Sequence, residues 1–173
     1  NATESLVDAL IDWRDENNIP EAEGAESEYY KDLDIPYEPR NAPLSRVEEL
    51  ALIKGFNSEL IELWKDLITI YGDGKVNINT ADRGVLLLLE LEKDLVDRVL
   101  EYRNGLDGIQ NTEDDQSFSE EGEIAKTLFE YEPLRTQDVN QLINLVSKGH
   151  LGVQSTHFRI KAVGHPYQST TFP

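Results

Sequence analysis

Apolar residues recur at spacings of three and four along most of the chain, and this periodicity predicts a series of helices. The first predicted helix, over 3–13, has an apolar face and an acidic face opposite it. The apolar face consists of Leu6, Val7, Leu10, Ile11 and Trp13, and the acidic face of Asp8, Asp12 and Asp15. Further helices are predicted over 45–53, 57–68, 80–90, 93–102, 120–129 and 137–147, with a short one near 26–33. The expected N-caps include Ser45, in a capping box with Glu48, and also Thr80 and Thr136.

Two segments have the pattern of strands. Residues 75–79 are short and β-prone, and residues 157–163 alternate with period two. A lone strand must pair, so 157–163 either closes a small sheet with the segment near Val153 or opens a β domain whose remainder lies outside this chain. The predicted fold class is mainly α, with a small β part (α+β).

The composition narrows the function classes. The 173 residues include 34 Asp and Glu against 16 Lys and Arg, a formal net charge of −18, which disfavours nucleic acid and anionic membrane surfaces as partners. The 39% hydrophobic content predicts a folded chain. No cysteine is present, which excludes disulfides and cysteine metal sites. The chain has no Met and begins with Asn1, so we expect a processed piece from which any targeting segment was removed.

Two loops concentrate oxygen ligands of the kind that calcium prefers. The first loop offers Asp12, Asp15, Asn17 and Glu26, and the second offers Asp107, Asn111, Thr112, Glu113, Asp114 and Asp115. Neither loop has the EF-hand spacing, and a solvated acidic loop with Asx turns is the alternative. We predict bound calcium because the clustered carboxylates repel one another and little positive charge lies nearby in the sequence. The predicted calcium ligands are Asp12, Asp15, Asn17, Glu26, Asp107, Thr112, Asp114 and Asp115.

Two stretches have the pattern of helix-hairpin-helix units, one around 50–61 and one from the string Val76-Asn-Ile-Asn-Thr-Ala81 to residue 103. DNA-binding versions need a glycine-rich hairpin whose N–H groups receive a phosphate. Here the first hairpin keeps only Gly55, and the second reads Leu91-Glu-Lys-Asp94. We interpret both as degenerate units that serve packing, with no nucleic acid bound. The abundant carboxylates do not by themselves indicate catalysis, so no enzyme activity is predicted. An acidic hydrolase is kept as an alternative hypothesis, behind the two binding roles described below.

An ordered set of short motifs resembles the minor pseudopilin K family of the bacterial type II secretion system. The motifs are Asp12-Trp-Arg-Asp15, Gly24-Ala-Glu26 with Tyr29-Tyr30, Asn41-Ala-Pro-Leu44 leading to Glu48-Glu-Leu50, Val76-Asn-Ile-Asn-Thr-Ala81, Thr112-Glu-Asp-Asp115 and Phe158-Arg-Ile-Lys-Ala162. The resemblance implies a calcium-binding helical domain, residues 1–155, inserted in a pilin-like fold. Only a strand and tail of that fold, residues 156–173, are then present. Asp12, Asp15, Asp114 and Asp115 become the foremost calcium ligands.

The resemblance also implies a function. A minor pseudopilin would lie at the tip of a periplasmic pseudopilus with minor pseudopilins I and J, and would assist the export of folded proteins across the outer membrane. Exoproteins and the outer-membrane secretin are further expected contacts. The full-length protein would be anchored in the inner membrane before assembly, while this chain itself would be soluble. The alternative is a calcium-stabilised periplasmic protein-binding module unrelated to secretion.

Overall fold

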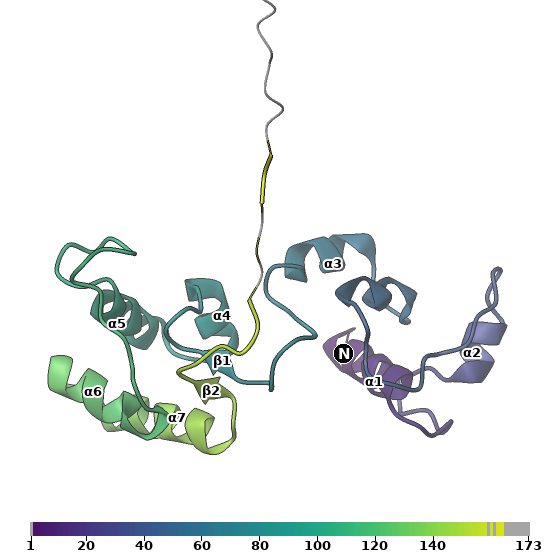
Figure 1. Cartoon of the computed structure of the whole chain (residues 1–173). Coiled ribbons are helices and arrows are strands. Elements are labelled where there is room, and N and C mark those ends of the chain that lie inside the picture. The colour runs from purple at the N-terminus through teal and green to yellow at the C-terminus, as the bar shows by residue number, and fades with distance from the viewer. Residues whose placement is uncertain (1, 159, 161, 165–173) are drawn as a thin grey trace, which may run out of the picture. The chain divides into compact units, whose positions relative to one another are not determined.

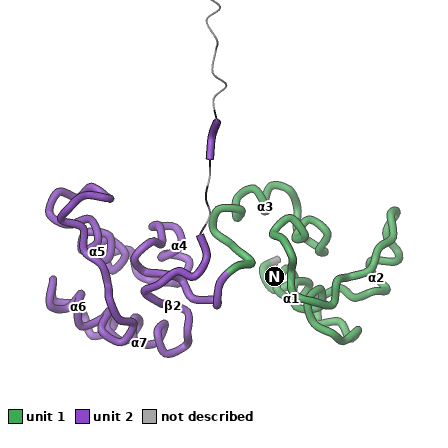
Figure 2. Tube along the Cα trace, viewed as in Figure 1, with its two compact units in different colours: residues 1–71 green, residues 72–173 purple. Residues whose placement is uncertain are grey.

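The structure, a computed structural model, describes residues 2–158, 160 and 162–164. The chain divides into two compact units, unit 1 with residues 1–71 and unit 2 with residues 72–173 (Figure 2). The described residues are mainly helical and include one two-stranded sheet (Figure 1). This architecture confirms the predicted mainly α class with a small β part.

Unit 1 contains α1 (Ala2–Arg14), α2 (Ser27–Lys31), the 3₁₀ helix η1 (Val47–Leu52) and α3 (Ser58–Trp64). Its buried core consists of Ala9, Trp13, Ala25, Tyr30, Leu50 and Ile53. The rings of Trp13 and Tyr30 meet edge to face with centroids 5.2 Å apart, a favoured geometry for aromatic pairs. This contact fixes the end of α1 against α2 and so positions the acidic side chains between them.

The predicted first helix is present, but only part of its predicted apolar face is buried: Trp13 and Leu10 pack in the core. Val7 and Ile11 are 51% and 43% exposed, whereas Asp12, which was assigned to the solvent side, is fully buried. The loop before α2 covers the Asp12 side, and the backbone N–H of Glu21 donates to Asp12 Oδ1 at 3.1 Å. A carboxylate is tolerated inside because this backbone donor replaces water.

Unit 2 contains β1 (Val76–Asn77), α4 (Arg83–Leu88), α5 (Lys93–Arg103), the 3₁₀ turn η2 (Glu121–Glu123), α6 (Ile124–Tyr131), α7 (Thr136–Ser147) and β2 (Leu151–Gly152). The two strands pair in parallel, with Val76 opposite Leu151 and Asn77 opposite Gly152. The core of unit 2 includes Ile78, Leu86, Leu95, Val96, Val99, Ile124, Leu128, Leu142 and Leu151. Helices therefore fill the crossover between the two strands.

Three of the predicted N-caps were wrong, and at α4 and α7 an acidic side chain makes the capping bond instead. Over 45–53 the expected α-helix is the shorter 3₁₀ helix η1, and the Ser45 hydroxyl bonds Glu49 instead of capping with Glu48. Asp82, not Thr80, caps α4 by accepting from Val85 N at 2.9 Å. At α7 the N-cap is Arg135, whose N–H donates to the Asp138 carboxylate at 3.1 Å. In addition, α3 ends at Trp64, earlier than expected.

The strand predicted over 157–163 is not seen in the described part of that segment, and residues 159 and 161 lie outside the described residues. Phe158, Ile160 and Val163 are 81%, 90% and 67% exposed. The strand that pairs with 76–77 is Leu151–Gly152. An alternating segment forms a strand only where a partner edge is available, and unit 2 offers its edge to β2.

Candidate metal centres

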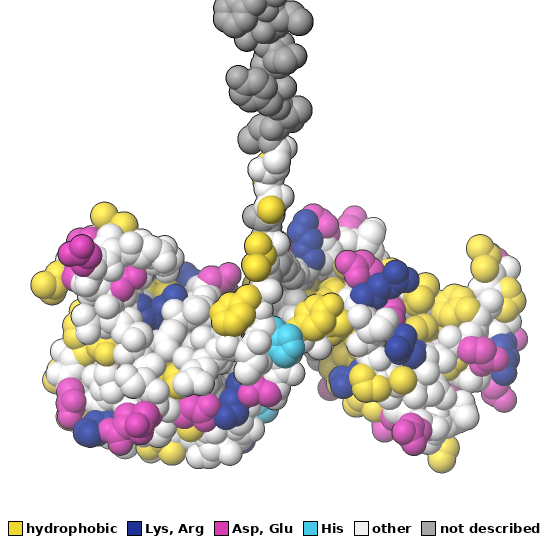
Figure 3. All heavy atoms as spheres, viewed as in Figure 1, with side chains coloured by type: hydrophobic (Ala, Val, Ile, Leu, Met, Phe, Trp, Pro, Cys, Tyr) yellow, Lys and Arg dark blue, Asp and Glu magenta, His cyan; other side chains and the backbone are white. Residues whose placement is uncertain are grey.

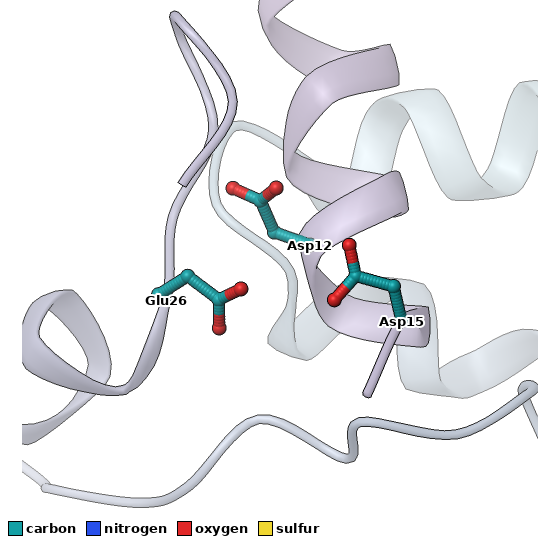
Figure 4. A group of neighbouring side chains, drawn as sticks. All are labelled: Asp12, Asp15 and Glu26. Carbon is teal, nitrogen blue, oxygen red and sulfur yellow. The ribbon is translucent and has the colours of Figure 1, made fainter. Parts of the chain in front are cut away.

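Three carboxylates meet where α1 ends and α2 begins (Figure 4). Asp12 lies in the last turn of α1, Asp15 directly follows that helix, and Glu26 directly precedes α2. One oxygen of each lies within 4.8 Å of the others. Among the described residues, this is the group of three such side chains that is close enough to hold a metal ion. The structure thus brings together three of the four residues predicted for the first loop.

Glu26 is the least satisfied member of this cluster. It is 5% exposed, and neither carboxylate oxygen accepts a hydrogen bond of normal geometry from a described residue. Burial raises the pKa of Glu26, and the charges of Asp12 and then Asp15 raise it further, while the nearby Ser27 N–H offsets a smaller part. A buried, unpaired carboxylate beside two others is unfavourable without a counter-charge. The arrangement is therefore suited to a cation.

The loop between α1 and α2 fixes the cluster through its backbone. A Cβ on Gly24 would lie 1.9 Å from Asp12 Oδ2, so only glycine permits this close approach. Asn17 N donates to Asp15 Oδ1 at 3.1 Å. The Asn17 side-chain oxygen itself accepts from Ile19 N at 2.7 Å, which makes it part of an Asx turn. A pocket of about 460 Å³ is lined by Glu26 together with Asn18 and Pro20.

The second acidic loop is organised around the Thr112 hydroxyl. Thr112 Oγ1 lies 2.9 Å from Asp114 Oδ1, 3.3 Å from Asp115 Oδ1, 3.4 Å from Asp107 Oδ1 and 3.0 Å from the Ile109 carbonyl oxygen. A hydroxyl has a single proton, so it satisfies only one of these four acceptors at a time. The hydroxyl therefore leaves the other acceptors around it without its proton.

Asp114 is the best-anchored acid of this loop. Its Oδ2 accepts from Leu106 N at 2.6 Å and from Asp107 N at 3.1 Å. The Thr112 hydroxyl, and then these two backbone donors, lower the pKa of Asp114. Gly105 has a φ of +63°, and a Cβ there would lie 2.5 Å from the Asp114 backbone oxygen, so this turn requires glycine. Asp107, Asp114 and Asp115 do not come as close together as the three carboxylates of unit 1.

The string Val76-Asn-Ile-Asn-Thr-Ala81 has a structural use in unit 2. The Asn79 side-chain amide donates to the carbonyls of Phe118 and Val153, both at 2.9 Å, and its oxygen accepts from Phe118 N at 2.8 Å. Asn77 Nδ2 donates to Ser155 Oγ at 2.9 Å. These bonds join segments that are distant in sequence, so the two asparagines act as internal connectors.

One buried charge escaped the sequence patterns. Arg103 ends α5 and is 8% exposed, although in the sequence it stands out only as a positive charge beside the acidic loop.

On the face drawn in Figure 3, acidic and basic side chains are interspersed. Within the described residues, we find no helix that meets the length and hydropathy requirements of a membrane span.

Comparisons with known proteins find a matching family model and several similar curated proteins. Residues 1–73 match the family described as "Type II secretion system (T2SS), protein K". Three curated proteins called "Type II secretion system protein K" are similar to this chain. The protein from Pectobacterium carotovorum subsp. carotovorum is 39% identical to it over 57 residues. Those from Dickeya chrysanthemi and Klebsiella pneumoniae are 29% identical over 108 residues and 36% identical over 86 residues. These alignments cover 33%, 58% and 47% of this chain, but only 17%, 29% and 26% of the relatives.

A solved structure shares the fold. It is a chain of "The Crystal Structure of the GspK-GspI-GspJ complex from enterotoxigenic Escherichia coli Type 2 Secretion System", with a TM-score of 0.61 and 20% sequence identity. The match covers 89% of this chain and 50% of the solved chain. At this identity the likeness establishes the fold alone, and the chain spans about half of the solved protein.

Proposed function

We propose that this chain, whose residues 1–73 match the type II secretion system protein K family, functions as part of a minor pseudopilin. In this role it lies at the tip of the pseudopilus and assists the export of folded proteins across the outer membrane. The observation that carries this proposal is the agreement of the family match over residues 1–73 with a fold match over 89% of the chain. The role requires recognition and mechanical contact, without bond chemistry.

The partners follow from the same comparison. The structural relative is named as a complex with GspI and GspJ, which supports minor pseudopilins I and J as partners here. Exoproteins and the outer-membrane secretin are further proposed contacts. The place of action is the periplasm, with the full-length protein anchored in the inner membrane before the pseudopilus assembles.

The proposed tip position has a physical basis in the helical content. Pilin-like subunits stack through similar surfaces, and a large helical domain cannot be covered by another subunit without a clash. We therefore assign residues 1–155 to a helical insertion that includes the two degenerate helix-hairpin-helix units. Residues 156–173 are assigned to a pilin-like β domain, where Phe158 and Ile160, which are exposed in this chain, would find partners.

Calcium is the proposed cofactor of the helical domain. The supporting observation is Glu26, with both oxygens buried and unpartnered between Asp12 and Asp15. These three carboxylates, with Asn17 nearby, would hold one ion. Asp107, Thr112, Asp114 and Asp115 would hold another, because their loop gathers oxygens around a single hydroxyl. Bound calcium would supply the positive charge that both clusters lack and would stabilise the loops.

Co-purification tests the proposed role. The chain is expressed with minor pseudopilins I and J in calcium-containing buffer and applied to size-exclusion chromatography, with an unrelated periplasmic protein as the negative control. Co-elution with I and J supports the pseudopilin role. Calcium binding without co-elution favours the alternative, a calcium-stabilised periplasmic module unrelated to secretion.

A further inference from the structure

A small polar pocket lies in unit 2 at the C-terminal end of α5, beside the turn at residues 79–80. Its volume is about 230 Å³. Five primary amides contribute to its wall, namely Asn79, Asn104, Gln110, Asn111 and Gln116. Arg103 is the positively charged side chain of the wall. The pocket is distinct from the oxygens gathered around Thr112, although Asp115 borders both.

The Arg103 guanidinium makes few hydrogen bonds for a buried cation. Its Nη1 donates to the Ala81 carbonyl oxygen at 2.5 Å. Within the described part of the chain, the guanidinium makes no other hydrogen bond and no ion pair, although it carries five N–H donors. Burial lowers the pKa of Arg103, and the charge of Asp115 only partly opposes this effect. Buried charges in proteins are almost always paired. The Arg103 guanidinium is therefore expected to bind a further, negatively charged hydrogen-bond acceptor.

Asp115 does not fill that need, because its own loop engages it. Asp115 Oδ2 accepts from Asn111 N at 2.7 Å, and its Oδ1 lies 3.3 Å from the Thr112 hydroxyl. A second group at the pocket is also unpaired, since Asn104 Oδ1 is buried without a hydrogen-bond partner. The group that the pocket offers to a ligand is therefore the Arg103 guanidinium, with its remaining N–H donors.

We propose that this pocket binds a carboxylate carried by a peptide, with the Arg103 guanidinium as the principal contact. Arginine and carboxylate form two parallel charge-assisted hydrogen bonds, which suits a planar donor with several free N–H groups. A phosphate dianion fits less well, because Asp114 and Asp115 lie in the adjacent loop and repel the higher charge more strongly.

The same loop couples the pocket to the calcium proposed above. Asp115 borders the pocket, and a cation bound in the loop offsets its negative charge. Carboxylate affinity is therefore expected to be higher with calcium than with a chelator. Only this dependence rests on the calcium proposal. The pocket proposal itself rests on Arg103, so the two proposals can fail separately.

Titration of the isotope-labelled chain with three capped tripeptides, followed by NMR, tests the pocket. The probes are acetyl-Ala-Ala-Ala with a free C-terminus, acetyl-Ala-Glu-Ala-amide and the neutral acetyl-Ala-Gln-Ala-amide, each used with calcium and with EDTA. At least one acidic peptide should shift the side-chain signals of Arg103 Nε, Asn104 and Gln116, and the neutral peptide should not. The two acidic probes separate a terminal carboxylate from a side-chain carboxylate.

A matched pair of variants adds a second readout. Arg103→Lys keeps the charge but loses the fork, so the affinity should fall roughly tenfold or more. Arg98→Lys is the control, because Arg98 also donates to a backbone carbonyl, that of Pro133, but already has Glu132 as an ion-pair partner. The affinity of that control should stay unchanged. Equal shifts with the neutral peptide, shifts remote from the pocket, or no shifts would overturn the proposal even if Arg103→Lys fails to fold.

Discussion

Neutralising Glu26 should stabilise the metal-free protein while removing much of its response to calcium. In Glu26→Gln the side chain keeps its size but loses the charge that lies within 4.8 Å of Asp12 and Asp15. In the chelated wild type this charge is buried and unpaired. The variant therefore removes an unfavourable interaction from the apo state and a ligand from the calcium-bound state.

The expected size follows from Coulomb's law. Two like charges 4.8 Å apart repel by about 3.5 kcal/mol at an effective dielectric constant of about 20. The carboxylates relax apart in the metal-free chain, so the net gain on substitution should be about 1–2 kcal/mol. For a unit of this size that gain raises the melting temperature by roughly 5–15 °C. Calcium at a hundredfold excess over its Kd adds about 2.7 kcal/mol to the wild type, and this increment should fall below about 1 kcal/mol in the variant.

Tryptophan fluorescence measures unit 1 selectively, because both tryptophans, Trp13 and Trp64, belong to it. Trp13 is 3% exposed and packs on Tyr30, so unfolding changes its surroundings completely. Thermal melts of wild type and Glu26→Gln are recorded with calcium and with EDTA. Each melt yields the free energy of unfolding of the unit that holds the cluster.

Glu28→Gln is the matched control, with the same charge change two residues away on an exposed side chain. It should leave both the chelated melt and the calcium increment nearly unchanged. A chelated Glu26→Gln melt at or below that of the wild type would refute the electrostatic reasoning. A full calcium increment in the variant would show that the ion, if bound, does not use Glu26.

Three further outcomes are expected. Gly24→Ala should lower the stability of unit 1 by about 1–3 kcal/mol in fluorescence melts, because the new Cβ meets Asp12 Oδ2. Asn79→Ala should destabilise unit 2 by about 2–4 kcal/mol by circular dichroism, since three backbone partners lose their bonds, whereas exposed Asn140→Ala should not. In EDTA, unit 1 should become more stable as the pH falls from neutrality towards the ordinary Glu pKa of 4.5. The raised Glu26 pKa makes the native state bind a proton at a higher pH than the unfolded chain does. A series of urea melts at different pH values measures this dependence, and Glu26→Gln should flatten it.

Periodicity predicted the helices well where one face is continuously buried. Helix α5 was expected over 93–102 and runs over Lys93–Arg103, because Leu95, Val96 and Val99 all enter one core. Helix α7 was expected over 137–147 and begins one residue earlier. In these two helices the continuous apolar stripe outweighs the conformational preferences of single residues, so hydrophobic periodicity was enough to predict their bounds.

Features that depend on distant partners were harder to predict. The burial of Asp12 requires the Glu21 backbone to lie against it, nine residues along the chain. The short sheet pairs residues about 75 positions apart, and such pairing leaves no local mark. In unit 1, the residue types of the first loop were enough to predict that Asp12, Asp15 and Glu26 lie close together. Closure of Asp107, Asp114 and Asp115 around one point depends on loop geometry that composition does not encode.

The parallel pair β1–β2 also determines how force passes through unit 2. The chain enters at β1 and leaves after β2, and the bonds from Val76 N to the His150 oxygen and from Ile78 N to the Gly152 oxygen, 2.9 and 2.8 Å long, join the two passages. Because the strands are parallel, pulling on the entering and leaving segments slides them along each other and loads these bonds in shear. Tension transmitted along the backbone thus bypasses α4–α7, which stay folded as a side branch while the short sheet carries the load.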